Sequence, residues 1–332
     1  MNIISFHDGH TATASLFCNG VLEACVSEER FSRKKCHIGY PYRSIDYCLS
    51  VLGDRDLNQV LVIGKRPPDP MHIRTSHTTE FSVKDLVEIQ YGYFKKIFID
   101  NESPKKVYKE FYSKLFVERN FPDTGYDIPE DTMWTYDSEL DSQIFRKIQI
   151  DTIKRHLLDD ESQIKFVEHH PAHAAYAYYA SNFRKDDCLV FTMDGSGEGI
   201  NATISIAKND KVEEVYRTSD CGIGRLWKYI TLLLAMTPDQ HEFKVMGLAP
   251  YAGKKYGIEV LKLFKNNFLH VDGLDFKYNN RPKDIYFSFK DILEGYRFDS
   301  IAAGLQIYTE QIVSEWISNA IQKYGITRVV FS

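Results

Sequence analysis

The sequence of 332 residues lacks several features that mark whole classes of protein. It has no apolar run near the roughly 20 residues that a helix needs to cross a bilayer, which argues against a transmembrane segment. The start, MNIISFHDGH, has neither a basic region nor a long apolar core, so it is not a secretory signal. Basic residues form no long block, and the formal net charge is -5. A nucleic acid or an anionic membrane surface is therefore not expected as the main partner.

The six cysteines include no C-x-x-C pair. In a chain of this length such thiols are expected to be reduced and mostly buried in strands, which indicates a cytoplasmic protein. The rest of the composition, 43% hydrophobic and 26% charged, is that of an ordinary globular protein. A chain this long suits two domains better than one.

One pattern of elements occurs twice along the chain. The apolar segment NIISF is followed by the polar loop HDGHTA and by a hairpin that turns at Asn19-Gly20, a dipeptide typical of type I′ turns. Much later, CLVFTM precedes the loop DGSGEG and a second hairpin that turns near Asn209-Asp210. Asp8 and Asp194 hold equivalent positions in the two copies. The repeat predicts a duplicated α/β fold with a cleft between two similar lobes.

The segment between the copies has a different character. We expect a helix in PYRSIDYCLSVLG, ending at Gly53, and a strand in QVLVIG. Residues 66 to about 150 are polar and aromatic, and VKDLVEIQYGYFKKIFI and PKKVYKEFYSKLFVERN have the apolar spacing of helices. We interpret this stretch as a helical insertion that lies over the first lobe or the cleft. The predicted domains are residues 1–186, including the insertion, and residues 187–332.

In the second lobe, helices are expected in GIGRLWKYITLLLAM and SIAAGLQIYTEQIVSEWISNAIQKYG, separated by an irregular aromatic segment at residues 265–298. The sequence stops in the apolar strand ITRVVFS. Because such a strand normally continues into further sheet, we expect the second lobe to be truncated here. Any site that needs later residues would then be incomplete.

Three histidines within five positions, in VEHHPAHAAYAYYA, form the first candidate site. Pro171 suits the first turn of a helix, so the helix is predicted to start at these histidines. His169 and His173 are four residues apart and His170 and His173 three apart, so either pair could face one metal ion. The alternative is a helix start that carries surface or core histidines. Asp194 could add a carboxylate, and two histidines with one aspartate suit zinc or ferrous iron.

Three further segments carry side chains or backbone suited to anions. The glycines of DGSGEG, residues 194–199, let backbone amides approach phosphate oxygens, and HDGHTA offers a matching loop in the other copy. EERFSRKK contains Arg33 and Lys34, which either bind an anion near the cleft or belong to a solvated strand end. HEFKVMGLAPYAG, residues 241–253, resembles a rigid turn in which Lys244 is a substrate ligand or an ordinary surface lysine.

Four motifs resemble, in their order, those of the O-carbamoyltransferases of antibiotic and nodulation-factor biosynthesis. They are HDGHTATASLFCNGVLEACVSEERFSRKK, EHHPAHAAYAYYAS, FTMDGSGEG and FKVMGLAPYAG. The long helix IAAGLQIYTEQIVSEW and the strand after it also match. The resemblance covers nearly the whole chain, with residues 66–150 the least typical part. It implies duplicated lobes of the actin-like, sugar-kinase type (ribonuclease H-like), related to the enzymes that make threonylcarbamoyladenosine on tRNA.

The resemblance also implies a chemistry. In that family a C-terminal domain joins carbamoyl phosphate and ATP into a carbamoyl-adenylate, and the N-terminal domain transfers the carbamoyl group to a substrate hydroxyl at a metal site. The implied metal ligands are His169, His173 and Asp194, with Fe2+ favoured over Zn2+. The residues implied for catalysis are His7, Asp8 and Lys244, with His7 a possible base for the acceptor hydroxyl. Those implied for the adenylate are His10, Lys34, Gly195, Ser196, Gly197 and Glu198.

The family pattern continues beyond these residues with a Gly-Gly nucleotide loop, a later aspartate ligand and the activation domain. We therefore expect the partners to be carbamoyl phosphate, ATP, a hydroxylated sugar or similar acceptor, and an activation domain or partner chain. Two alternatives follow from the same residues. A tRNA threonylcarbamoyl transferase is disfavoured because EERFSRKK and VMGLAPY match the small-molecule branch and no basic stripe is present. A non-catalytic metal- and nucleotide-binding relative is the other alternative.

Overall fold

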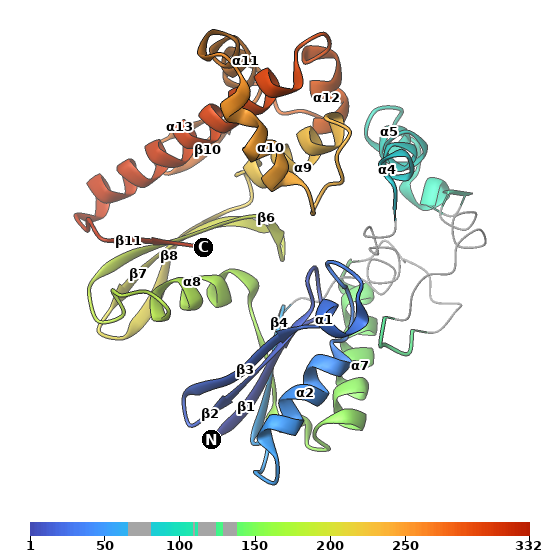
Figure 1. Cartoon of the computed structure of the whole chain (residues 1–332), viewed down its shortest axis with the longest axis vertical. Coiled ribbons are helices and arrows are strands. Elements are labelled where there is room, and N and C mark those ends of the chain that lie inside the picture. Colours follow the sequence, from blue (N-terminus) through green and yellow to red (C-terminus); the bar gives the residue numbers. More distant parts are fainter. Residues whose placement is uncertain (66–80, 109, 112–123, 129–137) are drawn as a thin grey trace. The chain divides into compact units, whose positions relative to one another are not determined.

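The computed structural model describes residues 1–65, 81–108, 110–111, 124–128 and 138–332 of the chain (Figure 1). Contacts divide the chain into two compact units, one from Met1–Ser82 with Ser103–His169 and one from Val83–Glu102 with His170–Ser332. Each unit has its own mixed sheet and its own hydrophobic core. The protein is therefore an α/β protein of two parts.

The sheet of the first unit has the strand order β3-β2-β1-β4-β5. Its strands are β1 (Asn2–His7), β2 (Thr13–Cys18), β3 (Val21–Ser27), β4 (Gln59–Ile63) and β5 (Ile164–Val167). β1, β2 and β3 run antiparallel in sequence order, whereas β4 is parallel to β1 and to β5. Asn19 and Gly20 both have positive φ, which confirms the predicted tight turn between β2 and β3.

Helices cover one face of this sheet (Figure 1). They are α2 (Tyr42–Leu52) and α7 (Ser138–His156), while α1 (Glu29–Ser32) and the 3-10 turn η3 (Glu161–Gln163) are short connectors. α2 buries Ile45, Cys48 and Leu52, whose spacing places them on one side of a helix. Phe145 and Ile153 of α7 join the same core. α2 ends before Gly53, as predicted.

The sheet of the second unit has the order β11-β6-β7-β8. Its strands are β6 (Cys188–Gly197), β7 (Ile200–Lys208), β8 (Lys211–Thr218) and β11 (Val329–Phe331). β6, β7 and β8 are antiparallel neighbours, and β11 is parallel to β6. This is the arrangement of β4-β1-β2-β3 in the first unit, so the predicted repeat of strand, loop and hairpin is confirmed.

Helices pack on both faces of the second sheet. Residues of β6 alternate between the faces: Val190 lies in a core with Ala174 and Tyr178 of α8 (His169–Tyr179). Phe191 faces the larger core and meets the ring of Trp316 in α13 (Phe298–Tyr324) at 5.0 Å between centroids. The other helical elements are α4 (Val83–Ile89), η2 (Gln90–Phe94), α5 (Lys95–Phe98), α9 (Ile223–Leu233), α10 (Glu242–Leu248), η4 (Ala249–Tyr251), α11 (Lys254–Asn267) and α12 (Ile285–Ile292).

Two local predictions are wrong, and one of the two alternatives for EERFSRKK is excluded. Residues 265–298 are regular: they contain β9 (Leu269–Asp272), β10 (Asp275–Tyr278) and α12, whose start is capped by the Asp284 carboxylate accepting from the Phe287 amide at 3.0 Å. Residues 241–253 form helix α10 and the turn η4 instead of a rigid turn alone. EERFSRKK is a helical turn that ends at Arg33 with φ 60°, not a strand end.

The segment predicted as an insertion is helical where it is described. Residues 83–98 form α4, η2 and α5 and belong to the second unit, whereas the prediction placed them with the first lobe. Residues 104–108 are also helical, and the rest of the second predicted helix lies largely outside the described residues. The units separate after His169, which groups α8 with the second sheet, whereas the predicted boundary lies after residue 186.

All six cysteines are free thiols, and five of them are buried while Cys25 is exposed. The expectation that they lie mostly in strands is wrong, since Cys36, Cys48 and Cys221 lie outside strands. No helix in the described part of the chain combines the length and apolar character needed to span a membrane.

Candidate functional site

Two of the three clustered histidines converge with an aspartate. Ligand atoms of His169, His173 and Asp194 all lie within 4.8 Å of one another. The histidines are one turn apart on α8, and Asp194 lies near the end of β6. His169 is the last residue assigned to the first unit, but it is also the first residue of α8, so the helix sets its position relative to the other two.

This group fits a divalent metal ion. An ion bound at about 2.0–2.2 Å holds neighbouring donor atoms about 3–3.5 Å apart, so small side-chain rotations would close the present spacing. Two imidazoles and one carboxylate suit zinc or ferrous iron. All three side chains are partly exposed, which leaves room for further ligands. Ser332 Oγ lies 3.0 Å from Nδ1 of His173, the kind of second hydrogen bond that orients a ligating imidazole.

His170 has a different role. It is buried, with Nδ1 2.7 Å from the Thr192 hydroxyl and Nε2 3.0 Å from the carbonyl oxygen of Ile200. Both ring nitrogens are therefore engaged by the second sheet, and His170 fastens α8 to β6 and β7. Of the two histidine pairs left open by the sequence, the geometry favours His169 with His173.

The Asp194 loop is packed tightly against helix α9. A Cβ atom on Gly224, the second residue of α9, would lie 2.7 Å from the backbone nitrogen of Gly195 and 3.0 Å from the carbonyl carbon of Asp194. Only glycine permits this approach without moving backbone. Asp194 Oδ1 also accepts from the Gly195 amide at 2.5 Å. The loop that presents Asp194 is therefore fixed by its neighbours.

The glycines predicted for the adenylate lie next to Asp194 along the same strand. Gly195, Ser196 and Gly197 end β6, and Glu198 with φ 57° forms the turn into β7. The β6–β7 pairing is interrupted between Met193 and Gly197, so this stretch departs from the regular ladder. Interrupted ladders leave backbone amides that can face a ligand.

Asp8, at the end of β1, is held by two side chains that sequence reasoning missed. Its Oδ2 accepts from the Tyr126 hydroxyl and from Nε2 of Gln149, each at 2.5 Å, and the carboxylate is buried. Burial, followed by the Asp8 charge, raises the pKa of Tyr126 well above its usual range, so its hydroxyl stays a donor. Neither residue belongs to a motif in the sequence, and only the fold brings them to Asp8.

His7 precedes Asp8, and burial lowers the pKa of its imidazole. The His7 ring centroid lies 6.4 Å from that of His169. A Cβ on Gly9 would lie 2.6 Å from Nε2 of His7, so the glycine makes space for this ring. A neutral imidazole beside a buried carboxylate can accept a proton. His10, also predicted here, is exposed in the following turn.

The two predicted lysines occupy other surroundings. Lys34 lines a pocket that lies wholly within the first unit. Lys244 is exposed on α10, with Nζ 5.9 Å from the centroid of the Phe243 ring. Its predicted catalytic role stays a prediction.

Comparison with known proteins gives the family. Residues 2–332 match the family described as carbamoyltransferase N-terminus. The chain is 25% identical to an uncharacterized protein of Synechocystis sp. and 26% identical to one of Methanocaldococcus jannaschii, covering 96% and 99% of this chain. It spans about half the length of these relatives, 48% and 49%.

Two further proteins are similar to this chain. The nodulation protein NolNO of Sinorhizobium fredii is 25% identical over 73% of this chain and 28% of its own length. A PPX-GPPA enzyme structure from Aquifex aeolicus aligns with 100% of this chain and 95% of its own at 10% identity and a TM-score of 0.30. With the family match spanning nearly every residue, this chain belongs to the carbamoyltransferase N-terminus family.

Proposed function

We propose that this chain is the transferase part of an O-carbamoyltransferase. It would move a carbamoyl group from carbamoyl-adenylate to a hydroxyl of a sugar or similar small molecule. The observation that carries the proposal is the convergence of His169, His173 and Asp194 within 4.8 Å in a chain that matches the family over residues 2–332. These three residues would hold a divalent ion, with Fe2+ favoured over Zn2+.

The other predicted site residues of the chain suit the parts of such a transfer. A bound divalent ion would supply Lewis-acid stabilisation of developing negative charge. Backbone amides of the loop that follows Gly195 would donate to phosphate oxygens of the adenylate. The acceptor oxygen attacks the carbamoyl carbon while the bond to the AMP phosphate breaks and AMP leaves with the electron pair. His7 would take the hydroxyl proton, and Asp8 would orient the acceptor.

The repeated strand order supports the further proposal that the two units are duplicated actin-like lobes. Carbamoyl phosphate and ATP would be used by an activation domain, because the chain spans only about half of its relatives. Free thiols throughout the described residues agree with a cytoplasmic location.

The test is release of AMP from chemically prepared carbamoyl-adenylate by the purified, Fe2+-loaded chain in the presence of hydroxylated sugars. We expect acceptor-dependent release that falls at least about a hundredfold in His173→Ala, since it removes one ligand of the group. His270→Ala is the matched control, because His270 is exposed on β9, where its Nδ1 lies 2.7 Å from Oδ1 of Asn279. Release that does not depend on the protein, or is equal in both variants, would overturn the proposal.

A further inference from the structure

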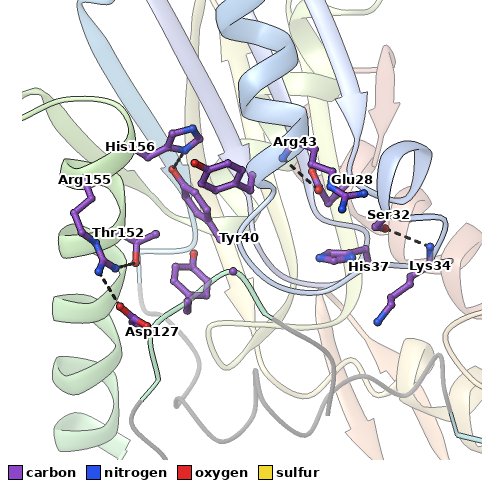
Figure 2. Close-up of a pocket in the computed structure, with 13 residues that line it drawn as sticks. Glu28, Ser32, Lys34, His37, Tyr40, Arg43, Asp127, Thr152, Arg155 and His156 are labelled. Atoms are coloured by element: carbon purple, nitrogen blue, oxygen red, sulfur yellow. Dashed lines mark hydrogen bonds and ion pairs between the residues drawn. The ribbon is translucent and has the colours of Figure 1, made fainter. Parts of the chain in front are cut away.

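A pocket of about 670 Å³ lies in the first unit, away from any residue assigned above except Lys34 and Tyr126. It is lined by the segment from Glu28 to Arg43, by residues 125–127 and by the second half of α7. Its volume falls within the roughly 300–1,000 Å³ of pockets that bind small molecules. Figure 2 shows Arg155 and Asp127 at one end of the lined region and Lys34 at the other.

Three cationic side chains line this pocket: Lys34 and Arg43 from the segment between Glu28 and Arg43, and Arg155 from α7. The Arg43 guanidinium donates from Nη1 to the Phe31 carbonyl oxygen at 3.0 Å. Arg155 donates to Asp127 at 2.8 Å and to the Thr152 hydroxyl at 3.4 Å. Because a guanidinium has five N–H donors, each arginine keeps donors that a ligand can use.

The two carboxylates of the pocket are already committed within the protein. Glu28 is buried, and its carboxylate accepts from the Ser44 amide at 2.8 Å, the Ser44 hydroxyl at 2.7 Å and the Arg43 amide at 3.3 Å. Asp127 is paired with Arg155. With its acids engaged and three cations on its walls, the pocket favours a negatively charged ligand.

One wall is aromatic and held rigidly. The ring of Tyr42 stacks on that of His156, with centroids 4.1 Å apart and planes 2° apart. His156 Nε2 lies 2.9 Å from the Asp46 carboxylate and Nδ1 lies 3.0 Å from the Tyr40 hydroxyl. Because a carboxylate only accepts, Nε2 carries the proton in the contact with Asp46. The His156 ring is thus fixed at both nitrogens, while half of Tyr42 is exposed.

We propose that this pocket binds a hydroxylated-ring small molecule that carries a phosphate or carboxylate group. The anionic group pairs with Arg155, Arg43 or Lys34, and the ring lies against the wall formed by Tyr42, His156 and Tyr40. Planar arginine forks match the oxygens of both anions. Tyr126 lines the same pocket and holds Asp8, so an occupant would lie next to the residue that positions Asp8.

The test is isothermal titration of the full chain with four probes of one ring size: glucose 6-phosphate, glucuronate, glucose and glucosamine. We expect glucose 6-phosphate or glucuronate to bind at least about tenfold more tightly than glucose, with glucosamine the weakest. The ratio of the first two identifies phosphate or carboxylate as the anionic group. No saturable binding of either anion below about 10 mM, or tightest binding of glucosamine, would overturn the proposal.

Two matched pairs of variants locate the binding. Arg155→Gln should weaken anion binding about tenfold, whereas Lys154→Gln, the neighbouring residue of α7 that does not line the pocket, should leave it within about twofold. Tyr42→Ala should weaken binding of the ring. Tyr47→Ala should not, because Tyr47 is similarly exposed on α2 but does not line the pocket. Equal effects within either pair would contradict this location. These experiments measure ligand binding and not carbamoyl transfer. A chain that fails the AMP-release test can therefore still confirm or contradict this pocket.

Discussion

The hydroxyl of Tyr126 donates to Oδ2 of Asp8 at 2.5 Å, although the two residues are 118 positions apart in the sequence. Gln149 of α7 donates to the same oxygen. A buried carboxylate at the end of β1 is thus oriented by groups from two other parts of the first unit. A carboxylate held this way has a fixed direction, which a residue that positions a substrate hydroxyl needs.

Tyr126→Phe should lower the free energy of unfolding by about 1–3 kcal/mol, because a buried carboxylate loses a donor. AMP release from carbamoyl-adenylate should fall as well, since Asp8 loses one of the two donors that orient it. Urea unfolding measures the first effect. Tyr179→Phe is the control: its hydroxyl also donates, to the Asp210 carbonyl oxygen at 2.7 Å, but on an exposed surface. A loss no larger in Tyr126→Phe than in this control would count against the role of Tyr126.

Gly9→Ala should displace the His7 ring, because the added Cβ would lie 2.6 Å from its Nε2. We expect lower stability and lower AMP release with an unchanged metal content. The double variant His7→Ala/Gly9→Ala tests the cause: with the ring removed, the Gly9→Ala change should cost little more. Additive losses in the double variant would show that the clash is not with His7.

Gly224→Ala should weaken metal binding by at least about tenfold. The added Cβ meets backbone of Gly195 and Asp194, so the loop that carries the predicted aspartate ligand has to move. Titration with Fe2+ under argon measures the affinity. Gly247→Ala is the matched control, because a Cβ there meets nothing within 4 Å and Gly247 also lies in a helix. Equal Fe2+ affinity in the two variants would contradict the claim that Gly224 of α9 holds the Asp194 loop in place.

The lowered pKa of His7 predicts a pH dependence of stability. Burial disfavours the charged imidazole of His7 in the folded chain, whereas in the unfolded chain its pKa is about 6.5. As pH falls through that value the unfolded state binds the extra proton, so this contribution to stability is present above it and lost below it. Urea unfolding at pH 7.5 and pH 5.5 should show a smaller difference for His7→Ala than for wild type. An equal or larger difference would refute the prediction.

Short-range patterns in the sequence predicted much of the fold. Asn19 and Gly20 readily adopt the positive φ angles of a tight turn, so this dipeptide alone predicts a hairpin. Residues four apart lie on the same face of any helix, so the spacing of His169 and His173 places them side by side. Longer-range arrangement was out of reach: nothing near Tyr126 or Gln149 indicates that both meet Asp8. The sequence did not predict the helix at 242–248, because Gly247 and Pro250 are residues typical of turns. In the structure this segment packs against α13, and that packing favours the helix.

The most direct test of the central claim is the metal content of the purified chain after anaerobic loading with Fe2+ and desalting. We predict about one tightly held ion per chain in wild type and in His270→Ala, and almost none in His173→Ala or Asp194→Ala. Circular dichroism would show that the depleted variants are folded. A wild-type chain that retains no ion, or a His173→Ala chain that retains as much as wild type, would contradict the account.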